Sequence, residues 1–389
     1  MKNQFFNPLQ LKHLMGHKGS YLKAIATEEG LRLCPDFAHG MVHVLDPIPV
    51  KMDKSLIYND DGRNKTYCIE EGLQIAKLAD ALDFSKAEVK EVDGVLYFEV
   101  GKKLFRMPNL CASGQEYDLN ITGYTGCLQL EAQTVEAIRK CDTACKPIGK
   151  ERFFLQGVYI DPDDGTAVAT DGRRMLYHKL EGKAGVSGLG AFVSANPNKG
   201  ETNQFILPTW VVPSLNGYSE IHYAYHDYSE PQGKRVSHHT WNYWMLKTDG
   251  ETYLFNPIEG QFPKWKRVAP EYLDDHIEYT KSVFDFEGMK RFKKSGTHDP
   301  MKCTFHDGTC TQMYNGEIEL DIGVELAGLP ENVDMACNAQ FLIDGVKVFG
   351  KQSEVDIGLP EATEGHIVKA MDIASTDGVI HYVIMPYNF

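Results

Sequence analysis

The stretch Ala169-Thr170-Asp171-Gly172-Arg173-Arg174-Met175-Leu176 stands out from the rest of the sequence. It begins in a short aliphatic run, Thr166 to Thr170, which an acidic turn joins to an earlier apolar run, Phe153 to Ile160. Asp-Gly pairs are typical of turns next to strands, because glycine reaches backbone angles that other residues avoid. The stretch therefore predicts strands that meet at tight turns near the middle of the chain.

Two other stretches belong with it. One is Gly260-Gln261-Phe262-Pro263-Lys264-Trp265-Lys266-Arg267-Val268, and the other ends the chain as Tyr382-Val383-Ile384-Met385-Pro386-Tyr387-Asn388-Phe389. The three stretches resemble, in the same order, three motifs of the bacterial DNA polymerase III beta subunit, the beta sliding clamp. The first resembles that family's Ala-Thr-Asp-Gly-His-Arg-Leu turn. The second resembles its Gly-Arg-Phe-Pro-Asp-Tyr-Arg-Arg-Val segment, and the third its Tyr-Val-Val-Met-Pro ending. Phe154-Leu155-Gln156-Gly157-Val158 is similar to that family's Leu-Asn-Gly strand. The resemblance extends over residues 128–389 and is thin over residues 1–125, as in a divergent member.

An Asp-Gly turn that starts an aromatic strand occurs three times, at Asp93, Asp249 and Asp377. Upstream of each turn is an apolar segment with helical spacing. These segments are Glu70 to Leu82, Leu207 to Leu215 and Asn338 to Phe349. A third of the chain is about 130 residues, a normal domain length. The pattern predicts an α+β fold with three tandem copies of one unit, although unequal spacing makes the repeat signal weak.

Four other segments complete the predicted organisation. Leu128 to Lys146 is typical of an amphipathic helix ended by Pro147, and Lys281 to Lys294 is predicted to be another helix. Two stretches rich in turn residues, Gly182 to Gln204 and Tyr228 to Asn242, are predicted to be surface loops.

The resemblance implies three clamp domains at residues 1–124, 125–269 and 270–389. It also implies a head-to-tail homodimer that forms a ring around duplex DNA without sequence preference. Lys and Arg total 40 against 54 Asp and Glu, a formal charge of −14, which taken alone argues against nucleic-acid binding. That argument is weaker for a ring, because a ring binds DNA topologically and needs only a weak electrostatic attraction between its bore and the phosphates.

Basic side chains on helices that face the bore are therefore expected. The candidates are Arg139, Lys140, Lys146, Lys281, Lys290, Arg291, Lys293, Lys294, Lys347 and Lys351. For any one of them, an ordinary solvated helix face is an equally good interpretation. The short second helix of the middle domain, bracketed by Pro208 and Pro213, carries no lysine.

The resemblance also implies a pocket between the middle and last domains that docks short apolar peptides of polymerases and clamp loaders. The pocket residues are Leu155, Thr170, Gly172, Arg173, Arg174, Met175, Pro263, Arg267, Val268, Val383, Ile384, Met385 and Pro386. Apolar members would hold a Leu or Phe anchor, and arginines would hold the peptide backbone and its acidic residues. Arg173 replaces the family's histidine and the chain ends in Tyr387-Asn388-Phe389, so the peptide preference should be shifted. The alternative is that these residues form interdomain core.

Catalytic and metal-binding patterns are poor. Asp161 to Gly165 lacks the ligand spacing of a calcium loop, and an acidic hairpin turn explains it better. The nine cysteines are scattered and predict reduced thiols rather than a metal site. The pairs His13/His17 and His222/His226 lack a His-Glu-x-x-His context and are predicted to be solvated or core histidines. We expect no catalysis, no cofactor and no metal; a hydrolase using Asp161 to Asp164 is the remaining enzymatic alternative.

The N-terminus shows no signal peptide, and no stretch is apolar enough to cross a membrane, so a cytoplasmic protein is expected. The predicted function is that of a sliding clamp, a non-catalytic processivity factor that tethers the replicative polymerase to DNA. The alternative is a monomeric clamp-fold adaptor that binds peptides without encircling DNA.

Overall fold

The computed structural model describes residues 21–28, 30–37, 41–44, 51–52, 54–57, 66–69, 88–92, 95–100, 103–107, 123–145, 152–161, 164–180, 205–232, 235–248, 251–255, 258, 260–272, 278–285, 301–306, 309–314, 318–325, 333–359 and 370–386. The chain divides into two compact units. The first comprises Met1–Cys127 with Ser219–Asn256, and the second Leu128–Tyr218 with Pro257–Phe389.

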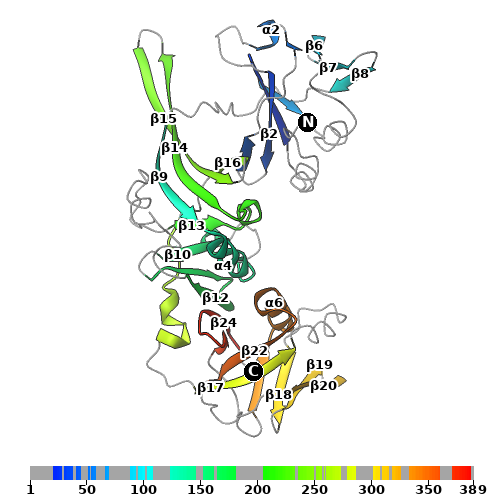
Figure 1. Ribbon diagram of the computed structural model, residues 1–389, viewed down its shortest axis with the longest axis vertical. Coiled ribbons are helices and arrows are strands. Elements are labelled where there is room, and N and C mark those ends of the chain that lie inside the picture. Colours follow the sequence, from blue (N-terminus) through cyan, green and yellow to red (C-terminus); the bar gives the residue numbers. More distant parts are fainter. Residues whose placement is uncertain are drawn as a thin grey trace. The chain divides into compact units, whose positions relative to one another are not determined.

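The first unit is built on an eight-stranded sheet in the order β5-β1-β2-β3-β16-β15-β14-β9 (Figure 1). In chain order these strands are β1 Tyr21–Thr27, β2 Gly30–Phe37, β3 Met41–Val44, β5 Thr66–Ile69, β9 Gly123–Leu130, β14 Ser219–Gln232, β15 Arg235–Thr248 and β16 Glu251–Phe255. The described residues of this unit also form a four-stranded sheet and a short helix: β4 Lys51–Met52, α2 Lys54–Ile57, β6 Glu88–Val92, β7 Val95–Val100 and β8 Lys103–Met107.

The second unit is built on another eight-stranded sheet, in the order β13-β10-β11-β12-β24-β23-β22-β17. Its strands are β10 Gly157–Asp161, β11 Thr166–Thr170, β12 Arg174–Lys179, β13 Phe205–Pro208, β17 Glu278–Asp285, β22 Gln352–Leu359, β23 Met371–Ser375 and β24 Ile380–Ile384. A four-stranded sheet accompanies it, made of β18 Met301–His306, β19 Thr309–Tyr314, β20 Ile318–Glu325 and β21 Val333–Cys337. The antiparallel pair β12 and β24 joins the middle of the sequence to its end, with Arg174 opposite Ile384.

Helices α4 (Ala132–Asp142) and α6 (Ala339–Phe349) lie next to each other in the second unit (Figure 1). The apolar face of α4, with Val135 and Ile138, is buried against strands β10 to β12. Asn338 caps α6 by accepting a hydrogen bond from the backbone N–H of Gln340, as N-cap residues do. These contacts define one packed α+β body.

Several large aromatic side chains lie in the core of the second unit. Tyr177 and Tyr382 are fully buried, and Tyr159 stacks on Phe262 with ring centroids 5.0 Å apart. Trp265 lies 5.2 Å from Tyr177, between ring centroids. Residues from β10, β12 and the 260–268 segment thus share one hydrophobic cluster, which explains why those sequence stretches belong together.

Several predicted elements are confirmed. Helix α4 lies within the predicted Leu128 to Lys146 segment, and α6 matches Asn338 to Phe349. The aromatic strands after the three Asp-Gly pairs are present as β7, β16 and β24. The acidic segment after Asp161 connects two paired strands, as expected of a hairpin turn.

Other predictions were wrong. Phe153–Leu155 forms a 3₁₀ turn before β10 rather than the start of that strand. Leu207 to Leu215 is not an α-helix: strand β13 ends at Pro208, and a single 3₁₀ turn follows at Val212–Ser214 with Pro213 in its first turn, because a proline cannot donate the interior hydrogen bonds of a helix.

Tyr228 to Asn242 is not a loop but the distal half of the β14–β15 hairpin, with Tyr228 opposite His239 and Pro231 opposite Val236. A strand ladder uses backbone groups, so polar composition did not exclude it. Pro231 lies near the end of the ladder, where a missing donor is tolerated.

The predicted helix from Lys281 to Lys294 begins instead as strand, since Lys281 to Asp285 belong to β17 and pair with β22. Residues 286–294 lie outside the described residues, as do the predicted helix Glu70 to Leu82 and the predicted loop Gly182 to Gln204. Within the described ranges, no helix is long and apolar enough to cross a membrane.

Candidate functional site

The turn between β11 and β12 is fixed by its own side chains. Thr170 Oγ1 donates to the Arg174 carbonyl at 2.6 Å and accepts from the Gly172 N–H at 3.0 Å. Asp171 Oδ1 accepts from the backbone N–H groups of Arg173 and Arg174 at 2.9 and 3.0 Å. Gly172 has a φ of +89°, which favours glycine. The Thr-Asp-Gly sequence thus specifies one conformation of the turn.

The end of the chain is attached to this turn. The backbone N–H of Met385 donates to the Arg173 carbonyl at 2.9 Å, one residue beyond the ladder that pairs β24 with β12. The Met385 residue is 40% exposed, and Pro386 is half-buried. An apolar side chain from the C-terminal segment therefore lies at the surface beside the turn.

Arg174 is an internal residue of the site. Its guanidinium donates to Asp344 Oδ2 at 2.6 Å, to Tyr382 Oη at 3.0 Å and to Asp171 Oδ2 at 3.0 Å, and lies over the ring of Phe341. Burial alone would lower the pKa of Arg174, but these partners raise it, so the side chain stays charged. Arg174 joins the turn to α6 and β24, and its Nε and Nη1 donors are engaged within the protein.

The predicted pocket residues divide into two groups. Buried members belong to the core or the central strands: Leu155, Met175, Val383 and Ile384. Half-buried members are Thr170, Arg174 and Pro386. Exposed members are Gly172, Arg173, Pro263, Arg267, Val268 and Met385. All of these residues belong to the second unit, and the turn and the C-terminal segment are in direct contact.

Two residues that were not predicted from the sequence, Arg152 and Phe153, lie beside the exposed group. Arg152 adopts a left-handed φ of +49°, and its Nη1 would be 3.4 Å from a Cβ placed on Gly172. Phe153 is 50% exposed, and a Cβ on Gly260 would lie 3.4 Å from its ring. Nothing in the local sequence indicates the backbone angle of Arg152, but an aromatic residue preceding a matched stretch was a usable signal for Phe153.

The 260–268 segment is anchored by a buried hydrogen bond and by partly exposed ion pairs. The Trp265 indole donates to Asp161 Oδ2 at 3.1 Å, and Lys266 pairs with Asp164 and, at 3.7 Å, with Asp161. The two carboxylates raise the pKa of Lys266, although burial alone would lower it. Asp161 and Asp164 thus hold the segment in place, which explains the acidic turn without invoking hydrolysis. The 3₁₀ turn Trp265–Arg267 buries the indole and leaves Val268 47% exposed.

The predicted basic residues are only partly described. Arg139 and Lys140 occupy the last turn of α4, where the Arg139 guanidinium also donates to the Leu215 carbonyl at 2.5 Å. Lys281, Lys347 and Lys351 are exposed, on β17, on α6 and directly after α6. Lys146, Lys290, Arg291, Lys293 and Lys294 lie outside the described residues.

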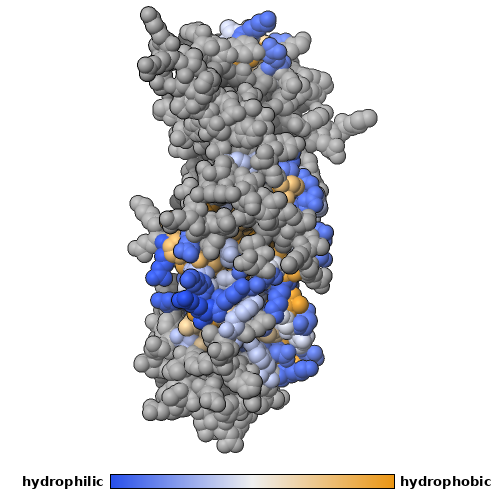
Figure 2. Space-filling view, turned by 90° about the vertical axis from the view of Figure 1, so that its left-hand side faces the viewer, coloured by the Kyte–Doolittle hydropathy of each residue, from blue (hydrophilic) through white to orange (hydrophobic). Residues whose placement is uncertain are grey.

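On the face shown in Figure 2, hydrophobic side chains lie directly beside strongly hydrophilic ones, without forming one broad apolar area among the coloured residues. One group of described side chains could hold a metal ion, and it lies in the first unit: Cys127, Glu220 and His222.

Comparisons with solved structures identify the fold. The chain is similar to the DNA polymerase sliding clamp of Pseudomonas aeruginosa, with a TM-score of 0.65 and 16% identity over 98% of this chain and 97% of that one. It is similar to the beta subunit of the DNA polymerase of Streptococcus pyogenes, with a TM-score of 0.65 and 14% identity over 99% of both chains. A third is the Helicobacter pylori beta clamp bound to a DNA ligase peptide, with a TM-score of 0.61 and 15% identity over 98% of this chain and 97% of that one.

No family model matches the sequence, and no curated protein matches it. The likeness in structure therefore shows the fold, that of the bacterial sliding clamps, over nearly the whole chain. The resemblance predicted from three short stretches is confirmed at this level, with the low identity expected of a divergent member.

Proposed function

We propose that this chain is a DNA sliding clamp that encircles duplex DNA and tethers a replicative polymerase. The proposal is supported by the combination of a clamp fold over 98% of the chain with a β11–β12 turn that is formed by one clamp-like stretch and bonded to another at the C-terminal segment. Fold alone does not specify function, so the local chemistry of the turn is the necessary second support.

In this proposal, the three domains 1–124, 125–269 and 270–389 form half of a ring, and two chains close the ring head to tail. A ring remains on DNA because it is closed, so it needs no tight phosphate contacts. The net charge of −14 is then compatible with DNA, since exposed lysines such as Lys347 and Lys351 need only line the bore.

The exposed group at the β11–β12 turn is the proposed peptide site. Phe153, Val268 and Met385 supply apolar surface, as an apolar anchor of a polymerase or clamp-loader peptide requires. Because Arg174 is engaged with Asp344 and Tyr382, we assign peptide contacts to Arg173 and Arg267, whose side chains are exposed.

In this proposal, the chain is a non-catalytic, cytoplasmic processivity factor without a cofactor. Its partners are duplex DNA, a second copy of itself, and peptides of the polymerase and the clamp loader.

Light scattering on the purified full chain tests ring closure. We expect a mass of two chains at micromolar concentration, because a head-to-tail ring requires two closed interfaces. A mass of one chain, combined with retained binding of a polymerase-derived peptide, would contradict the ring and favour the monomeric adaptor.

A further inference from the structure

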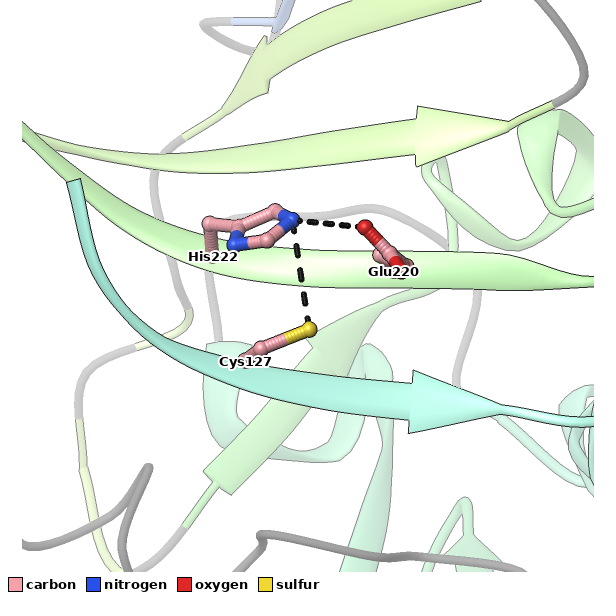
Figure 3. Close-up of side chains that lie close together, drawn as sticks. All are labelled: Cys127, Glu220 and His222. Atoms are coloured by element: carbon pink, nitrogen blue, oxygen red, sulfur yellow. Dashed lines mark hydrogen bonds and ion pairs between the residues drawn. The ribbon is translucent and has the colours of Figure 1, made fainter.

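Three side chains of different chemistry converge between β9 and β14 in the first unit (Figure 3). Cys127 comes from β9, and Glu220 and His222 come from β14, the neighbouring strand of the sheet. Glu220 and His222 are two residues apart, so they point to the same side of their strand. Cys127 and His222 are 95 positions apart, which is why no local spacing in the sequence indicated this group.

The ligand atoms face one another at short range. His222 Nε2 lies 3.0 Å from Glu220 Oε2 and 3.9 Å from Cys127 Sγ. All three potential ligand atoms lie within 4.8 Å of one another. Figure 3 shows the imidazole with one nitrogen toward both partners, so a single point exists that all three atoms can approach.

These distances are close to those of a tetrahedral zinc site. Zinc bonds of about 2.3 Å to sulfur and about 2.0–2.1 Å to nitrogen and oxygen place tetrahedral ligand atoms about 3.4–3.6 Å apart. The two separations from His222, 3.0 and 3.9 Å, would change by a few tenths of an ångström to meet them, and the Glu220 and Cys127 ligand atoms, which lie within 4.8 Å of each other, would have to reach the same range. Side-chain rotation supplies such shifts without moving the strands.

Burial and charge also favour a cation. His222 is buried, Cys127 is half-buried, and the Glu220 side chain is 30% exposed, so one side of the group is open to solvent. A thiolate, a carboxylate and a neutral imidazole together neutralise a divalent ion. Lys247 lies opposite Glu220 in the β14–β15 ladder.

We propose that Cys127, Glu220 and His222 form a three-ligand site for a divalent ion of the zinc class, with water as the fourth ligand. As the metal–sulfur bond forms, the thiol releases its proton to solvent. The ion would cross-link β9 to β14 and stabilise the folded chain by mass action. This inference does not depend on the clamp function, since it concerns a different unit from the β11–β12 turn.

The test uses the full chain, stripped with a chelator and titrated with Zn²⁺ against a chromophoric competitor. We expect the wild type to bind one equivalent of Zn²⁺ and Cys127→Ser to bind none at this site. The affinity for Zn²⁺ should fall at least about tenfold in Glu220→Gln and in His222→Gln. Co²⁺ should show a thiolate charge-transfer band and the intense visible bands of a tetrahedral ion, both absent in Cys127→Ser. Cys141→Ser is the matched control: Cys141 is a buried thiol that donates to the Ala167 carbonyl, and its loss should leave the equivalent intact.

Thermal unfolding supplies the second readout, because zinc should raise the melting temperature of the wild type and of Cys141→Ser but not of Cys127→Ser. If Cys127→Ser fails to fold, the test uses Glu220→Gln instead, because Glu220 is partly exposed; its zinc affinity and the zinc-induced rise in its melting temperature should both be lower than in the wild type. Two results would overturn the proposal: folded variants of the three residues that bind zinc as tightly as the wild type, or a wild type that binds no zinc. Cys127, Glu220 and His222 would then be a hydrogen-bonded group only.

Discussion

Two hairpins of this chain are held together in different ways. In the β11–β12 hairpin, the side chains of Thr170 and Asp171 bond to the backbone of the turn itself. In the β14–β15 hairpin, fourteen residues of each strand pair from Ser219 opposite Thr248 to Gln232 opposite Arg235. The first is fixed by local side-chain chemistry and the second by the length of its backbone ladder.

This difference bears on the proposed peptide site. A turn whose side chains are already bonded can hold exposed groups in one arrangement, so Arg173 and Met385 are presented at fixed positions. A long ladder needs no particular residue at its end and therefore tolerates sequence change there. Substitutions at the two hairpins should consequently have very different effects.

The largest effect is expected for Arg174→Met. Removing the guanidinium leaves the carboxylate of Asp344 in a largely buried place without its closest partner, and breaking a buried ion pair costs about 3–5 kcal/mol. Denaturant unfolding measures the loss. Arg173→Met is the matched control, because its side chain is exposed, and it should change the free energy of unfolding by less than about 0.5 kcal/mol. Equal effects of the two variants would contradict the internal role of Arg174.

The next effect concerns binding. Deleting Met385 to Phe389 removes exposed apolar surface at the turn while leaving β24, which ends at Ile384, paired with β12. We expect the affinity for a fluorescent polymerase-derived peptide to fall by about 2 kcal/mol or more, as for a hot-spot residue. Fluorescence anisotropy measures it, with circular dichroism as the check on folding. An unchanged dissociation constant would place the peptide site elsewhere.

A smaller effect is expected for Gly172→Ala. With φ at +89°, an alanine there strains the backbone, at about 1–2 kcal/mol. The atom nearest to the added Cβ is the end of the Arg152 side chain at 3.4 Å, so crowding adds little. Gly217→Ala is the control, since nothing lies within 4 Å of its added Cβ, and it should leave the melting temperature nearly unchanged. A stable Gly172→Ala variant would show that the turn is not restricted to glycine.

The smallest effect is expected in the longer hairpin. A Gly-Gly insertion between Gln232 and Arg235 lengthens the connection between paired strands, and loop lengthening costs only about 0.6 kcal/mol for each doubling. The same insertion after Gly172 should cost more, because it separates Asp171 from the N–H groups that it accepts from. Comparable melting temperatures for the two insertions would remove the contrast between the hairpins.

The sequence predicted elements whose signals are local. Helices α4 and α6 have apolar residues at helical spacing, and three strands follow Asp-Gly pairs. It failed where pairing overrides composition: the polar residues of 228–242 form a ladder, and Lys281 to Asp285 pair with β22. Backbone partners far along the chain cannot be identified from local composition.

The candidate site shows the same limit. Three stretches indicated its members, but Arg173 and Arg174 are identical neighbours in sequence, and only tertiary packing shows that one is exposed and the other bonded to Asp344. Likewise, Leu155 and Met175 are core residues beside an exposed Phe153 that was not predicted. The sequence thus identified the region, while burial divided it into support and surface.

Retention on DNA tests the central proposal most directly. The protein is assembled on circular duplex DNA with its loader, separated by gel filtration, and then the circle is cut. We expect the wild type to remain with the circle and to leave the linear form, because only a closed ring is lost from free ends. Retention that is unchanged after cutting, or absent on both forms, would contradict a sliding clamp.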